Sequence, residues 1–146
     1  MRFPNTSALT ASFTLRQREQ INPPRLGRLY LTSLRALLEA NREESLQASE
    51  ELRKAPFRDP EGMYYLARQI SYLGQAPEAL EMLTRAIDNG FFCYPAMVRD
   101  PWFEALRTRT EFTDLLHRSR QLCREASASF LAASGDSLLR INGEVF

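Results

Sequence analysis

The feature that most constrains this chain is a helix, a short break and a second helix within residues 59–86, which read DPEGMYYLARQISYLGQAPEALEMLTRA. Asp59 followed by Pro60 is a strong helix start, because aspartate accepts from free N–H groups and proline suits the first helical position. Apolar residues recur three and four positions apart in both halves. This spacing predicts two amphipathic α-helices, and Gly74 predicts the end of the first one.

Helical spacing continues on both sides of this unit. Apolar residues predict a helix over residues 26–38, and Asn41 predicts the capped start of the next one. Further on, Asp100 precedes another proline, and Thr108 has a glutamate three positions later, which is the spacing of a capping box. A long amphipathic helix is then predicted up to about residue 132. We therefore expect an all-α chain of six helices in antiparallel pairs, with the last helix as a C-terminal cap.

The pattern divides the chain into three parts. Residues 1–25 contain three prolines and no sustained periodicity, so we predict a flexible leader or linker with at most a short helix over residues 10–20. Residues 26–133 form the predicted helical domain. Residues 134–146 form a C-terminal tail that either packs back as an extended cap or frays.

Composition excludes several classes of partner. Lys and Arg total 19 against 18 Asp and Glu, so the net charge of +1 gives no basic excess for direct binding of nucleic acid. No apolar run is long enough for a membrane-spanning helix. Two cysteines without CxxC spacing predict neither a disulfide framework nor a zinc site, which favours a reducing, cytoplasmic setting.

No catalytic constellation stands out. His117 is the single histidine, and no nucleophile or metal ligand stands at a useful spacing, so we predict a surface residue. Cys93 and Cys123 lie among apolar residues and are interpreted as small buried side chains. The glycines are isolated and form no phosphate loop. We expect no enzyme activity, no cofactor and no metal site.

Residues 60–93 resemble a tetratricopeptide repeat. The family's large, small and turn positions are occupied by Met63, Leu66, Ala67, Gly74, Ala79, Leu83 and Ala86. Residues 26–59 resemble a degenerate copy. Residues 90–116 resemble the closing element that follows the last repeat in a group of bacterial signalling and regulatory proteins. The resemblance implies a superhelical stack of helix pairs, in which alanine-sized residues let helices approach closely.

The resemblance also implies a partner-binding surface, because the first helix of each repeat faces a concave groove in this family. The residues at those positions are Tyr64, Arg68 and Tyr72 in one repeat, and Tyr30 and Leu34 in the other. Tyrosine and arginine commonly anchor partners. Tyrosines also pack against neighbouring helices, so groove and core remain open as interpretations. Tyr30 and Leu34 replace the family's carboxylate-clamp residues, so that mode of binding an acidic C-terminus is not expected.

These observations predict a non-enzymatic scaffold or adaptor that binds a peptide or helix of a partner protein. Two alternatives are open. The apolar face formed by Leu34, Leu37 and Leu38 suits a homodimer. The chain also suits a sensory element of a larger bacterial signalling or transcription-regulating protein. Trp102 and Phe103 are interpreted as core residues beneath the last helix.

Overall fold

The computed structural model describes residues 6–21, 23–56, 58–133, 140–141 and 144–145. The helices are α1 (Thr6–Gln20), α2 (Arg25–Leu38), α3 (Arg42–Lys54), α4 (Pro60–Tyr72), α5 (Ala76–Asp88), α6 (Tyr94–Arg99), the 3-10 helix η1 (Pro101–Leu106) and α7 (Thr110–Ala132). Two short strands, β1 (Arg140–Ile141) and β2 (Glu144–Val145), pair antiparallel in the tail. The prediction of a helical chain is confirmed, but the expected number of six helices is wrong, because the described residues form seven α-helices and one 3-10 helix. The strand pairing was not expected.

Local capping chemistry fixes most helix ends. The side chains of Asn41, Asp59 and Asp100 accept hydrogen bonds from backbone N–H groups at the starts of α3, α4 and η1. Gly74 follows α4 with a φ of +80°, a conformation that glycine adopts without steric cost. One predicted cap is wrong. The helix α7 begins at Thr110 rather than after Thr108, and no side chain caps it.

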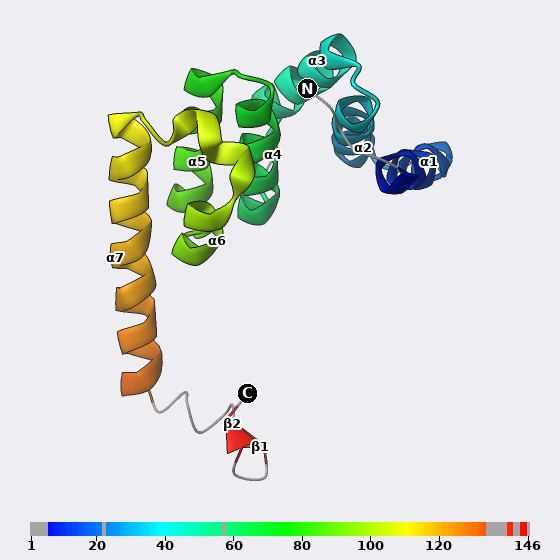
Figure 1. The fold of residues 1–146 in the computed structure, drawn as a ribbon. Coiled ribbons are helices and arrows are strands. Elements are labelled where there is room, and N and C mark those ends of the chain that lie inside the picture. The colour runs from blue at the N-terminus through cyan, green and yellow to red at the C-terminus, as the bar shows by residue number, and fades with distance from the viewer. Residues whose placement is uncertain (1–5, 22, 57, 134–139, 142–143, 146) are drawn as a thin grey trace.

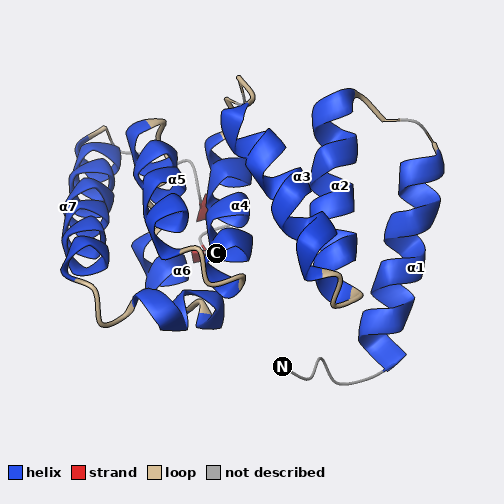
Figure 2. Cartoon of the chain, turned by 90° about the horizontal axis from the view of Figure 1, so that it is seen from above, coloured by secondary structure: helices blue, strands red, loops and turns tan. Residues whose placement is uncertain are grey.

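Consecutive helices lie side by side in chain order, as Figure 2 shows for α1 to α5, with α7 at the far side. The helix pairs that pack most extensively are α2 with α3 and α4 with α5. The two short helices pack on different neighbours, η1 on α4 and α6 on α7. Segments near in sequence therefore provide most of the packing.

The core is centred on α4 and α5. Leu66, Ala67, Ala79, Leu83 and Ala86 are all 0% exposed, as their predicted places on the inner faces require. Small side chains at these contacts let the two helix axes approach, and larger ones fill the spaces beside them.

Most residues of the last helix are exposed. Phe112 near its start belongs to the core, but Phe130 and Leu131 near its end are 42% and 61% exposed. Figure 1 shows this end of α7 running past the other helices. The predicted apolar stripe therefore packs on the other helices in the first part of α7 and is exposed in its last turns.

The N-terminal segment differs from the expectation of a flexible leader. Residues 6–20 form α1, which packs beside α2 (Figure 1). The sequence did not reveal this contact because the apolar residues of α1 do not gather on one face. Phe13 of α1 is 62% exposed. Among the side chains of α1 that the structure describes, Ser12 is the one that is buried.

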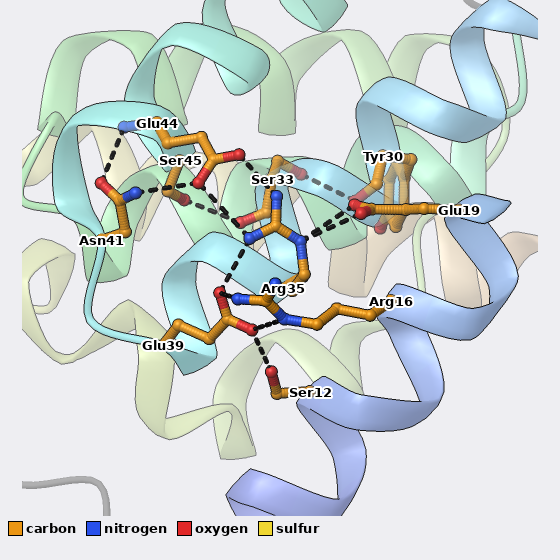
Figure 3. Close-up of polar contacts among 10 residues, drawn as sticks. All are labelled: Ser12, Arg16, Glu19, Tyr30, Ser33, Arg35, Glu39, Asn41, Glu44 and Ser45. Atoms are coloured by element: carbon orange, nitrogen blue, oxygen red, sulfur yellow. Dashed lines mark hydrogen bonds and ion pairs between the residues drawn. The ribbon is translucent and has the colours of Figure 1, made fainter.

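Charged side chains hold α1 against α2. Figure 3 shows Arg35 between the carboxylates of Glu19, Glu39 and Glu44, at distances of 3.1, 2.8 and 2.5 Å. Arg16 pairs with Glu39 at 2.7 Å from the α1 side. Since Arg35 is 8% exposed, this cluster is an interhelical contact rather than a solvated charged surface.

Candidate protein-interaction groove

Two adjoining cavities form a groove along α2 and α4. The inner cavity has a volume of about 300 Å³ and is lined by Tyr30, Leu34, Tyr65, Arg68, Gln69 and Trp102. The outer cavity has a volume of about 540 Å³ and is lined by Leu26, Gly27, Tyr30, Leu31, Asp59, Glu61, Gly62 and Tyr65. Because Tyr30 and Tyr65 line both cavities, we treat them as one surface and call it the α2–α4 groove.

Helix periodicity places the lining residues on one side. On α2, Leu26, Tyr30 and Leu34 are four residues apart, and this spacing puts them on one helix face. On α4, Tyr65 and Arg68 are three residues apart and face them across the groove. The groove is therefore made by regular helix surfaces rather than by loops, which favours a preformed shape.

A buried carboxylate fixes the end of the groove beside η1. Asp100 is 7% exposed, and its Oδ2 accepts a hydrogen bond of 2.9 Å from the Tyr64 hydroxyl. The same oxygen lies 2.8 Å from Nε of Arg68. Oδ1 accepts from the backbone N–H of Trp102 at 3.0 Å. One side chain thus connects α4 to η1 and compensates the charge of Arg68.

The guanidinium of Arg68 also contacts two aromatic rings. It lies 4.5 Å from the ring centroid of Trp102 and 5.6 Å from that of Tyr65. Such contacts are favourable because the ring faces carry negative potential. Arg68 therefore contributes to the inner cavity a guanidinium that is paired with Asp100 and in contact with two rings.

The structure brings together three of the five predicted site residues. Tyr30, Leu34 and Arg68 line the groove. Tyr64 does not, because it is 4% exposed and its ring packs 4.6 Å from Phe91. Burial, followed by the interaction with Asp100, raises the pKa of the Tyr64 phenol.

Tyr72 also lies outside the lining of the groove. Its ring is half-buried and lies 5.0 Å from that of Trp102. For Tyr64 and Tyr72, therefore, the core-packing interpretation describes the observed contacts. Whether the groove binds a partner remains a prediction.

Sequence reasoning missed Tyr65 and Trp102. Tyr65 is 39% exposed, and its position four residues after Glu61 was a usable signal, because both then share a helix face. Trp102 was assigned to the core, although it is only half-buried and lines the inner cavity. Its companion Phe103 is 0% exposed, as predicted.

Burial also affects the phenol of Tyr30. This hydroxyl is removed from solvent beside Gln69, and desolvation raises its pKa above the ordinary value. Tyr30 is therefore neutral at physiological pH, and it separates the inner and outer cavities as an uncharged aromatic side chain.

The other candidate residues form no functional site within the described part of the chain. His117 is exposed, as predicted. The two cysteines were predicted to be buried, but Cys93 is exposed and Cys123 is half-buried. Within the described ranges, no three His, Cys, Asp or Glu residues are grouped so as to hold a metal ion. None of the helices in this part of the chain is both long and apolar enough to cross a membrane. In the face predicted for a homodimer, Leu37 is 3% exposed, whereas Leu34 and Leu38 are half-buried and Leu34 lines the groove.

Comparisons with protein-family models, with curated protein sequences and with solved structures gave no match.

Proposed function

We propose that this chain is a non-enzymatic protein-interaction module that binds a peptide or helix of a partner protein in the α2–α4 groove. The observation that carries the proposal is the pair of adjoining cavities, whose walls come from α2, α4 and η1. Exposed aromatic and aliphatic side chains in a preformed hollow are typical of sites that anchor partner side chains.

The proposal includes the tetratricopeptide-like arrangement. The helix pairs α2–α3 and α4–α5 then act as two repeats, and α6, η1 and α7 act as the closing element. Their order in Figure 2 and the small buried residues of α4 and α5 support this assignment. In such a stack the first helices of successive repeats line the concave side, and the position of the groove between α2 and α4 supports the assignment.

Site-specific crosslinking tests the proposal. A photoreactive amino acid at Tyr65 is expected to capture a protein from cells of the source organism, while the same group at Gln47, an exposed residue of α3, is not. The captured protein is then purified and titrated against the wild-type chain and Tyr65→Ala. We expect Tyr65→Ala to weaken binding at least tenfold and Gln47→Ala to leave it unchanged. Equal affinity for both variants would refute the groove as the binding surface.

Homo-oligomerisation is the second candidate function, and one observation favours it. Phe130 and Leu131 are exposed next to each other at the end of α7, and adjacent exposed apolar residues commonly mark association surfaces. Light scattering over a range of protein concentration tests this alternative. A dimer that Phe130→Glu dissociates would support it, and a monomer at every concentration would exclude it.

A further inference from the structure

The two ends of the α2–α4 groove differ in charge. The outer cavity has an apolar wall from α2, formed by Leu26 and Leu31, and an acidic rim from the start of α4, formed by Asp59 and Glu61. The inner cavity has aromatic and aliphatic walls, and its single charged lining residue is Arg68. A partner that fits both cavities must therefore match an apolar inner end and an acidic outer end.

The acidic rim has no basic partner in the described part of the chain. Neither Asp59 nor Glu61 forms an ion pair there. Two basic residues of α2 and α4 are engaged elsewhere, since Arg25 pairs with Glu51 at 3.7 Å and Arg68 pairs with Asp100 at 2.8 Å. One oxygen of Asp59 accepts from the backbone N–H of Glu61, so the start of α4 compensates part of this charge.

The exposure of these two carboxylates suits an ion pair with a basic side chain of a partner. Both residues are exposed, and both therefore remain hydrated until something covers them. A basic side chain that reaches the rim gains attraction without the large desolvation cost of a buried ion pair. An acidic partner segment would be repelled at the same place.

We propose that the occupant of the groove is a peptide segment of a partner protein that carries two apolar side chains and a lysine or arginine beside the outer one. This inference rests on the proposed function and adds the chemistry of the partner. The apolar side chains enter the inner and outer cavities on either side of Tyr30 and Tyr65. The basic side chain lies against Asp59 and Glu61.

Selection from a phage-displayed library of random 12-residue peptides tests the inference. We expect the peptides that bind the immobilised chain to be enriched in pairs of apolar residues with Lys or Arg next to one of them. The best binder is then synthesised with a fluorescent label, together with versions in which its basic residue is changed to Gln or Glu. Fluorescence anisotropy gives the affinity of each peptide.

Two glutamates give a matched pair of protein variants. Glu61 is the second residue of α4, and Glu111 is the second residue of α7, where it is also exposed and lies outside the groove. We expect Glu61→Gln to weaken the basic peptide about two- to fivefold, as for an exposed ion pair, and Glu111→Gln to have no effect. Glu61→Lys should weaken it further and should improve binding of the peptide with Glu. Raising the salt concentration should reduce the effect of Glu61→Gln.

The outcomes separate this inference from the proposed function. Binders that Tyr65→Ala weakens but that show no preference for basic residues, or no response to Glu61→Lys, would overturn the inference alone. Binders that Tyr65→Ala leaves unaffected, or a selection that yields no binder, would overturn both. A self-association of the chain that Tyr65→Ala abolishes would show that a second copy occupies the groove, and this too would overturn the inference. Circular dichroism of every variant confirms that the fold is retained.

Discussion

Replacing Arg35 with methionine tests whether charge holds α1 in place. The Arg35 side chain is 9% exposed and lies within 3.1 Å of Glu19, 2.8 Å of Glu39 and 2.5 Å of Glu44. Methionine keeps a long apolar side chain but removes the positive charge and the N–H donors. Three carboxylates on three different helices then lose the cation that they share.

The expected loss of stability follows from the exposure of these groups. Removing one partner from a buried ion pair costs about 3–5 kcal/mol. We expect a loss near the lower end, about 3 kcal/mol, because Glu44 is 36% exposed and Glu39 keeps its pair with Arg16. With a urea m-value of about 1.5 kcal/mol per molar, the unfolding midpoint should fall by about 2 M.

The matched control makes the same substitution in an exposed pair. Arg118 lies 2.6 Å from Asp88, and the two side chains are 49% and 48% exposed. Arg118→Met should therefore change the free energy of unfolding by no more than about 0.5 kcal/mol. Amide hydrogen exchange should also show that Arg35→Met removes protection from α1 before α4 and α5, whose contacts it does not alter. Equal midpoints for the two variants, or an even loss of protection along the chain, would refute the reasoning.

Three further predictions concern the stability of the helical stack. Arg16 holds the pKa of Glu39 at about 2, below its ordinary value of 4.5. The contribution of Glu39 to stability should therefore be complete above about pH 4.5 and lost as the pH falls toward 2. An acid titration followed by NMR of α1 tests this, and α1 signals that do not change over this range would disprove it. Ser49 is buried and its hydroxyl has no hydrogen-bond partner in the described chain, so Ser49→Ala should leave the free energy of unfolding unchanged or raise it by up to about 1 kcal/mol. Ser33→Ala removes a 3.0 Å hydrogen bond to the buried amide oxygen of Gln69 and should lower the free energy of unfolding by about 1–2 kcal/mol. Urea unfolding measures both, and the reverse order would contradict the prediction. Ala79→Leu should cost about 1–3 kcal/mol in thermal unfolding, because the residue is 0% exposed between helices, and a neutral result would show that the core can repack.

The groove could be predicted only in part from the sequence. The lining positions Tyr30, Leu34 and Arg68 follow from helical phase together with the resemblance to a repeat. Tyr65 shares a helix face with Glu61 and follows from the same phase. The contribution of Trp102 does not, because it depends on how η1 packs against α4. That contact places Tyr64 in the core beside Asp100 and leaves Tyr65, the next residue, at the surface.

The sequence alone determined the positions of most helices and the identity of the central core. Helix ends are decided by nearby residues such as Asn41, Asp59 and Gly74, which act on the backbone of their own turn. The inner faces of α4 and α5 are decided by apolar periodicity. Both effects are local, so they can be recognised before the chain is folded.

Only the tertiary structure decided the role of α1 and the composition of the groove. The helix α1 has no apolar stripe that predicts a contact, and its position depends on Arg35, which meets carboxylates from α1 and α3 only after folding. The groove likewise requires α2, α4 and η1 to be in place together. A sequence shows which side chains share a helix face, but the packing of distant segments determines which faces are covered and which remain open to a partner.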